Sequence, residues 1–162
     1  MPNSSQDHPN VIIFPPIILG TTVAVGCLLQ WFLPIGLLAT MSQAWRIPVG
    51  AGIFLAGVLL AATGRRAMVR LRTNVSPLLP TTALATDGIF GWTRNPLYSG
   101  GTLMMLGIAF VFGLDWLLLF IPPSLLVLHF GVVRREEEYL ERKFGDQYRR
   151  YKASVARYGF GL

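Results

Sequence analysis

Two short polar segments carry the side chains that could do chemistry in this sequence. The first covers residues 87–100 and reads DGIFGWTRNPLYSG. It places a cation, Arg94, and an amide, Asn95, directly before Pro96, a residue that favours the first turn of a helix. Backbone N–H groups at a helix start lack partners, so this combination can bind an anion such as a carboxylate or a phosphate. Taken alone, the segment also fits an interfacial anchor, with its arginine extended to water and its tryptophan and tyrosine in an aromatic belt.

The second segment is the run Arg134–Glu138, which reads RREEE and directly follows an apolar stretch. Anionic lipid should repel three acids next to a membrane surface, so their presence there is unexpected. One or two of these glutamates could bind a cation such as an ammonium group. The alternative is a solvated helix start, where acids suit the positive end of the helix dipole and pair with arginines.

Other kinds of site find little support. His8 and His129 are the only histidines and Cys27 is the only cysteine, so we expect no metal site, intramolecular disulfide or redox pair. We expect His129 to pack or hydrogen-bond within the fold. The GxGxxG, P-loop and GxSxG motifs are absent, which leaves nucleotide-binding loops and serine hydrolases unsupported.

The elements that position both segments should lie in a membrane. Only 14% of the residues are charged, against about 25% in an average soluble domain. Asp7 and Arg46 are the only fully charged residues before position 65. Crossing a hydrocarbon core takes about 20 apolar residues. We predict a single all-α membrane domain: a helical bundle with spans at 14–36, 47–71, 97–113 and 116–133, after a disordered lead at 1–10.

Prolines and glycines set the expected limits of these helices. Pro15–Pro16 and Pro34 bound the first span, because proline fits best at helix starts or beyond helix ends. Pro122–Pro123 are expected to break the fourth span, which should form a tight hairpin with the third. Beyond it, residues 134–158 should form amphipathic cytoplasmic helices, the first of them ended by Gly145.

The basic residues predict the orientation. Arg46 alone lies between the first two spans, and the other thirteen of the fourteen lie at the end of span two, between spans two and three, or after span four. The positive-inside rule then places those regions, and both termini, in the cytoplasm. Residues 73–96, an unusually long connection rich in proline, threonine and glycine, lie on the same side, and such loops are often functional.

Read together, the two polar segments resemble the isoprenylcysteine carboxyl methyltransferase family and its phospholipid methyltransferase relatives. Those proteins share a pattern like G-x-Y-x-x-x-R-H/N-P-x-Y-x-G, then an apolar hairpin, then E-E-x-x-L-x-x-x-F-G-x-x-Y-x-x-Y. The resemblance covers roughly residues 73–158. The matching residues are Gly88, Phe90, Arg94, Asn95, Pro96, Tyr98 and Gly100, and then Glu136, Glu137, Leu140, Phe144, Gly145, Tyr148 and Tyr151, followed by Val155 and Arg157. Asn95 and Phe90 depart from the pattern, since eukaryotic members commonly have His and Tyr there.

The resemblance implies S-adenosylmethionine bound near the cytoplasmic surface and methyl transfer to a lipophilic substrate. Methyl transfer is an in-line displacement, so the protein must align the acceptor and exclude water. Arg94 could hold a carboxylate acceptor, and a glutamate could serve as base for an amine acceptor. The resemblance implies Arg94 and Glu137 as catalytic residues, and as cofactor-binding residues Trp92, Asn95, Pro96, Tyr98, Gly100, Glu136 and Glu137.

Several alternatives stay open. The acceptor could be an isoprenylcysteine-like carboxylate or a phospholipid amine. A reductase similar to the sterol reductases, using NADPH, or a non-enzymatic membrane scaffold or transporter would keep a similar fold. The net charge of +6 does not point to nucleic acid, because the basic residues flank apolar spans. Small residues in the second span would allow a homodimer.

Overall fold

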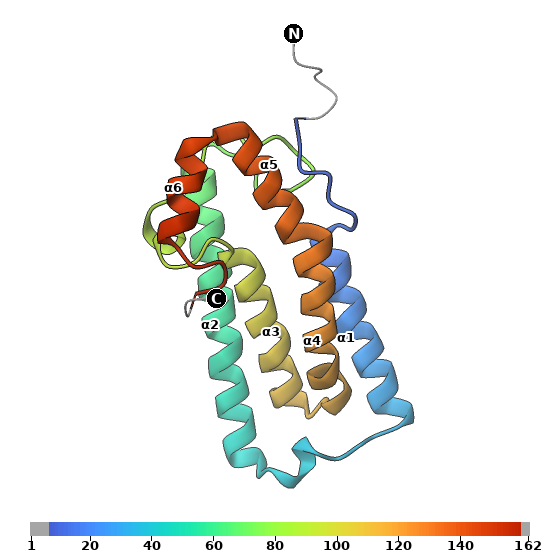
Figure 1. The fold of residues 1–162 in the computed structure, drawn as a ribbon. Helices are drawn as coiled ribbons and strands as arrows, with labels where there is room; N and C mark the ends of the chain where they lie inside the picture. The colour runs from blue at the N-terminus through green and yellow to red at the C-terminus, as the bar shows by residue number, and fades with distance from the viewer. Residues whose placement is uncertain (1–6, 160–162) are drawn as a thin grey trace.

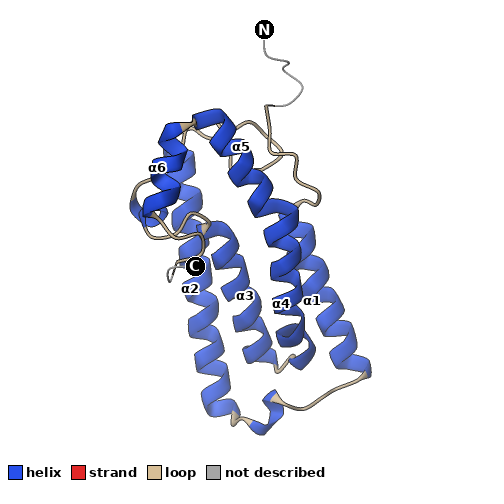
Figure 2. Ribbon diagram, in the orientation of Figure 1, coloured by secondary structure: helices blue, strands red, loops and turns tan. Residues whose placement is uncertain are grey.

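The computed structural model describes residues 7–159, and the regular structure in that range is entirely helical, which confirms the predicted all-α class. In Figure 1 the long helices lie side by side and the shorter ones lie at one end of the bundle. Turns and loops connect them (Figure 2). The helices are α1 (Pro15–Phe32), α2 (Gln43–Arg70), α3 (Pro96–Phe112), α4 (Asp115–Leu128), α5 (Arg134–Phe144) and α6 (Asp146–Ser154), with short 3-10 turns at Leu38–Thr40 and Gly88–Gly91 and a π-helical turn at His129–Val133.

Three helices are long and apolar enough to cross a membrane. They are α1, α2 and the continuous helix Asp115–Phe144, which have 18, 28 and 30 residues. The apolar helix α3 has 17 residues, or about 26 Å at 1.5 Å per residue, which is slightly less than a hydrocarbon core of about 30 Å. These lengths and compositions favour a location in a membrane.

The fourth helix continues through two prolines. The sequence predicted that Pro122 and Pro123 would break this span, but α4, the π turn and α5 form one helix. Both prolines lie on the exposed face, where their rings meet no neighbouring helix. Beside them, the hydroxyl of Ser124 donates a hydrogen bond to the carbonyl of Ile121 at 2.8 Å. Membrane helices accommodate proline through such side-chain bonds and through π-type adjustments like the one that begins at His129.

The backbones of α2 and α3 lie in direct contact at glycines. A Cβ atom added to Gly57 would lie 2.6 Å from the carbonyl oxygen of Gly100, and one added to Gly107 would lie 2.7 Å from that of Gly50. Real Cβ atoms do not approach backbone this closely. Small residues of α2 and α3 therefore let the two helices pack closely within one chain.

A single carboxylate organises the end of the bundle opposite α5 and α6. Asp115, the first residue of α4, is fully buried and accepts hydrogen bonds from the backbone N–H groups of Gly36, Leu37 and Leu38 at 2.8, 3.1 and 2.7 Å. These residues belong to the connection between α1 and α2. Helix α1 ends at Phe32, four residues before the predicted limit of the first span.

We expect Asp115→Ala to destabilise the protein by at least about 2 kcal/mol, since three buried donors lose a charged acceptor. The measurement is the thermal unfolding midpoint in detergent, compared with Asp87→Ala, which removes an exposed carboxylate. Equal midpoints for the two variants would show that the Asp115 carboxylate does not hold this connection.

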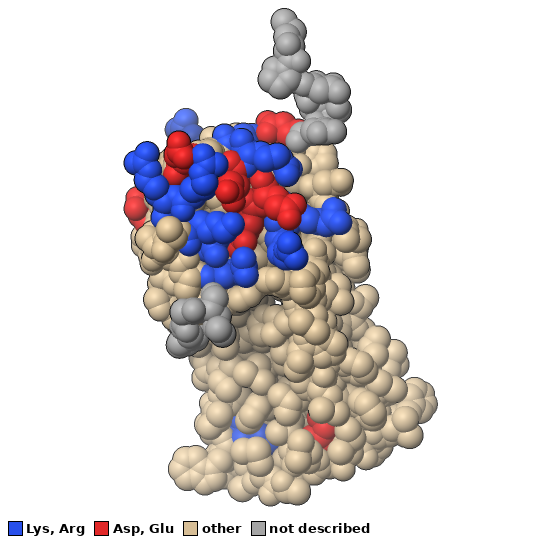
Figure 3. All heavy atoms as spheres, viewed as in Figure 1, with Lys and Arg blue, Asp and Glu red and all other residues tan. Residues whose placement is uncertain are grey.

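Charged side chains gather at the end of the bundle that carries α5 and α6 (Figure 3). The rest of the visible surface is almost entirely uncharged, apart from small patches near the opposite end, where Arg46 and Asp115 are buried. The structure thus places the charge-rich segments of the sequence on one side of the apolar region.

Candidate functional site

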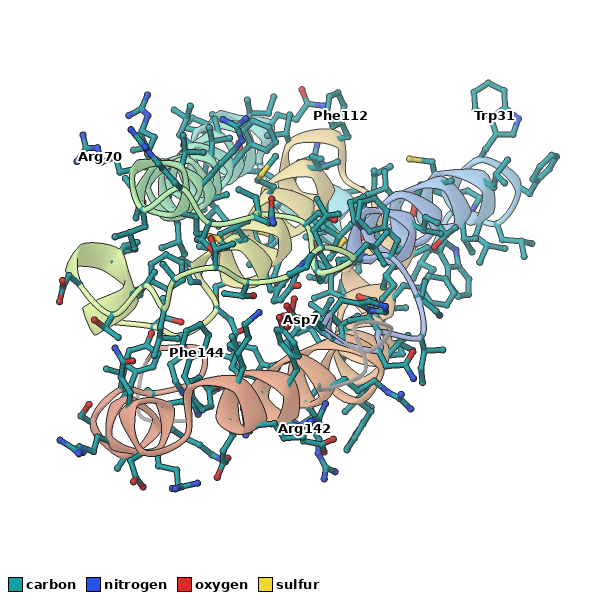
Figure 4. All side chains as sticks on the ribbon, turned by 90° about the horizontal axis from the view of Figure 1, so that it is seen from above. Asp7, Trp31, Arg70, Phe112, Arg142 and Phe144 are labelled. Atoms are coloured by element: carbon teal, nitrogen blue, oxygen red, sulfur yellow. The ribbon has the colours of Figure 1, made fainter. Side chains whose placement is uncertain are left out.

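A cavity lies where α3 begins. In Figure 1, α3 starts lower in the bundle than the end of α2, and α5, α6 and the loop before α3 surround the space above it. Figure 4 looks down on this end, with α5 and α6 on one side and α2 and α3 on the other. The polar lining residues include Arg94, Asn95, Tyr98, Glu136, Glu137 and Tyr148, and the apolar ones include Met68, Leu84, Ala85, Phe90, Leu97 and Leu140.

Glu137 lies at the centre of a buried ion cluster. Arg157 donates from Nε to Oε1 and from a terminal nitrogen to Oε2, both at 2.8 Å. Arg94 approaches Oε1 at 3.0 Å, and the side chains of Arg94 and Glu137 are each only 8% exposed. Burial alone would raise the pKa of Glu137, but the hydrogen bonds from Arg157 and the charge of Arg94 hold that pKa below its usual value. Both carboxylate oxygens of Glu137 are therefore occupied.

The segment after α6 fixes Arg94 and Arg157 relative to each other. The backbone N–H of Arg94 donates to the carbonyl of Ala156 at 3.0 Å. The Thr93 hydroxyl and the Asn95 amide both donate to the carbonyl of Arg157, at 3.0 and 3.1 Å. Arg157 follows the second of the two sequence motifs, but the sequence alone indicates no role for it. Nothing in its spacing predicts that the chain folds back toward Arg94 after α6.

Glu136 and Tyr98 form a second polar pair. The Tyr98 hydroxyl donates to Glu136 Oε1 at 2.8 Å, and both residues line the cavity. Tyr98 is the one hydrogen-bond partner recorded for Glu136 within the described residues 7–159. Burial raises the pKa of Glu136 to about 7; the neighbouring charge of Glu137 adds to this effect and the Tyr98 hydrogen bond opposes it. Glu136 is thus a carboxylate that can gain or lose a proton near neutral pH.

Arg94 offers a free donor at the cavity. Its Nε is buried and has no hydrogen-bond partner in the part of the chain that the structure describes. Buried polar groups in proteins are almost always paired with protein, water or a ligand. A guanidinium whose terminal nitrogen contacts Glu137 can still donate from Nε to an anionic group such as a carboxylate.

The N-terminal segment covers this end of the bundle. Residues 7–10 belong to the predicted disordered lead, yet here they contact α5, while residues 1–6 lie outside the described range. Asp7 accepts hydrogen bonds from Lys143 at 2.6 Å and from Tyr139 at 3.1 Å. Pro9 lines the cavity, so this segment forms part of its wall.

Sequence comparison assigns the family. Residues 45–147, more than half of the chain, match the family model of the phospholipid methyltransferases. The chain belongs to this family. It is also 40% identical over 70 residues to an uncharacterized protein of Haemophilus influenzae, an alignment that covers 43% of this chain and 86% of that protein. No solved structure matches the chain. Membership of the phospholipid methyltransferase family supports an enzyme that transfers methyl groups in a membrane.

The structure brings together most of the residues that the sequence singled out for a methyltransferase site. Trp92 and Gly100 do not line the cavity. The Trp92 side chain is 47% exposed and lies beside Gly159, while Gly100 packs on Gly57 of α2. The predicted residues found around the cavity are Arg94, Asn95, Pro96, Tyr98, Glu136 and Glu137.

Proposed function

We propose that this protein transfers a methyl group from S-adenosylmethionine to a lipid acceptor at the cytoplasmic face of a membrane. The observation that carries the proposal is the convergence of the two polar segments on one cavity. They are separated by a helical hairpin in the sequence, yet they place Arg94, Tyr98, Glu136 and Glu137 around the same space. Family membership supplies the reaction type.

The lining residues fit S-adenosylmethionine. The free Nε of Arg94 suits the carboxylate at the amino-acid end of this ligand. Apolar side chains such as Met68 and Phe90 suit its adenine ring, and Tyr148 presents an aromatic side chain to the same cavity. When bound, S-adenosylmethionine supplies an electrophilic methyl group on a sulfonium. The residues of the chain then have to orient the acceptor and exclude water.

The alternative NADPH-dependent reductase is less well supported. Its cofactor carries a pyrophosphate and a further phosphate, which proteins bind with several basic side chains. Among the described lining residues of the cavity, Arg94 is the one basic side chain, which is fewer than these phosphates need.

We also propose that α1 to α4 all cross the membrane. An even number of spans is consistent with the gathering of charged residues at one end (Figure 3). By the positive-inside rule that end, with both termini, is cytoplasmic. A lipid acceptor could then reach the cavity from the bilayer with its apolar tail still among the helices.

The test is a calorimetric titration of S-adenosylmethionine into the detergent-purified protein. We expect saturable binding by the wild type and at least about tenfold weaker binding by Arg94→Lys, which keeps the charge opposite Glu137 but loses the Nε donor. Arg66→Ala, which removes an exposed arginine on α2, should bind like the wild type. A folded wild type that binds NADPH but not S-adenosylmethionine would overturn the proposal.

A further inference from the structure

We propose that Tyr139 is a latch that closes the cavity, and that S-adenosylmethionine enters and leaves when this latch opens. The latch joins two segments that lie over the cavity: an N-terminal strap, residues 7–13, and a covering loop, residues 73–85. Tyr139 does not itself line the cavity, so it acts by positioning these segments. The identity of the ligand rests on the proposed function, whereas the closure rests on contacts within the chain.

Both segments contribute to the wall of the cavity. Pro9 of the strap lines it, as do residues 73–77 and Thr81 of the covering loop. Seen from above in Figure 4, Asp7 lies on the side of α5 that faces α2 and α3. The strap and the covering loop therefore lie between the cavity and the water at this end of the bundle.

The Tyr139 hydroxyl connects the strap and the covering loop to α5. Tyr139 is 3% exposed, and its hydroxyl accepts hydrogen bonds from the backbone N–H of Thr81 and from Lys143 Nζ, each at 3.0 Å. The hydroxyl donates to the carboxylate of Asp7 at 3.1 Å, and Lys143 donates to the same carboxylate at 2.6 Å. Loss of this one hydroxyl would weaken the attachment of both segments at once.

The strap is held differently at its two ends. At its inner end, the N–H of Ile12 donates to the carbonyl of Gly131 at 3.0 Å, and Val11 and Ile13 pack against a buried apolar cluster. At its outer end, the Asp7 side chain is 54% exposed and is held by polar contacts to the latch. Segments with few buried apolar contacts and exposed hydrogen bonds open locally at a low cost in free energy. The strap should therefore open from its outer end while the inner end stays attached.

The covering loop is tied to itself at its base. The hydroxyl oxygen of Thr73 accepts a hydrogen bond from the backbone N–H of Thr82 at 3.0 Å. The side-chain amide of Asn74 donates to the carbonyl of Pro80 at 2.7 Å. Because of these bonds, the loop keeps its shape when its bond to the latch breaks.

A latch that does not touch the ligand has a characteristic effect on binding kinetics. Its loss makes opening more frequent in both the free and the occupied protein, so association and dissociation of the ligand accelerate together. The dissociation constant then changes little, because the free and the bound state are affected alike. A residue that only supported the cavity wall would instead raise the dissociation constant by speeding dissociation alone.

The first experiment measures the rates at which the full chain in detergent binds and releases labelled S-adenosylmethionine. We expect Tyr139→Phe, which keeps the ring but loses the hydroxyl, to raise both rate constants about tenfold. Asp7→Asn should raise both about threefold, because exposed ion pairs contribute less. The dissociation constants of both variants should stay within about threefold of the wild-type value. Asp146→Asn, which removes an exposed ion pair with Arg149 on α6, should leave both rate constants unchanged.

A second experiment needs no S-adenosylmethionine. Met68 lines the cavity from α2, and Cys27 is the only cysteine, so Met68→Cys combined with Cys27→Ala places a single thiol at the cavity. We expect N-ethylmaleimide to modify this thiol about tenfold faster when Tyr139→Phe is added. Adding Asp146→Asn should leave the modification rate unchanged. Thermal unfolding midpoints establish that the variants compared are folded.

Two results would overturn the latch. One is an unchanged rate of thiol modification in Tyr139→Phe. The other is a dissociation constant that rises in Tyr139→Phe because dissociation alone is faster. If the folded wild type bound no S-adenosylmethionine, the proposed function would fall, and thiol modification would still decide whether Tyr139 closes the cavity.

Discussion

Replacing Glu137 by alanine should destabilise the protein by about 3–5 kcal/mol, because it leaves the charges of two largely buried arginines without their partner. Arg94 and Arg157 both contact this carboxylate, and the Arg94 side chain is 8% exposed. We also expect loss of S-adenosylmethionine binding, since the position of Arg94 at the cavity depends on Glu137. The measurements are the thermal unfolding midpoint in detergent and a calorimetric titration.

Glu138→Ala is the matched control, because it removes an exposed glutamate from the next position of the same helix.

The pH dependence of the unfolding midpoint distinguishes the loss of the ion pairs of Glu137 from the loss of its side-chain packing. The pKa of Glu137 is lowered in the folded protein, so its contribution to stability is complete above the ordinary glutamate pKa and is lost as the pH falls through the lowered value. The unfolding midpoint of Glu137→Ala should therefore fall less on acidification than that of the wild type. Wild-type-like midpoints for Glu137→Ala would refute a stabilising role of the cluster.

The membrane helices could be predicted because their signal is local. Long apolar runs indicate helices wherever backbone groups must be satisfied without water. The helix end at Gly145 was also predictable, and the residue has a positive φ of 53°. The continuity through Pro122 and Pro123 was not, since it depends on which face of the helix those prolines occupy. That face is decided by the packing of α4 on α1 and α3.

The site was only partly predictable for a similar reason. The types of Arg94, Tyr98 and Glu137 show which chemistry they can support, but their pairing requires the chain to turn back after α6. This turn places Arg157 against Glu137, while Glu136 accepts its hydrogen bond from Tyr98. Sequence alone therefore could not decide which glutamate is tied up in ion pairs and which one is available at the cavity.

Gly57→Leu should disrupt the contact between α2 and α3 and, with it, the cavity. A Cβ atom at position 57 would lie 2.6 Å from the carbonyl oxygen of Gly100 and 2.8 Å from the backbone nitrogen of Met104. Neither backbone atom can move without shifting α3, so we expect a loss of about 3 kcal/mol or more in stability. The first turn of α3 carries Tyr98, so S-adenosylmethionine binding should also fall. Detergent-based thermal unfolding and calorimetric titration measure the two effects.

Gly52→Leu is the matched control on the same helix, because an added Cβ there has no atom within 4 Å among the described residues. Leucine has a higher helix propensity than glycine, so this variant should fold and bind S-adenosylmethionine like the wild type. If both variants bound equally well, the position of α3 against α2 would not control the cavity. A selective loss in Gly57→Leu would show that the contact between Gly57 and Gly100 sets the geometry in which Tyr98 meets Glu136.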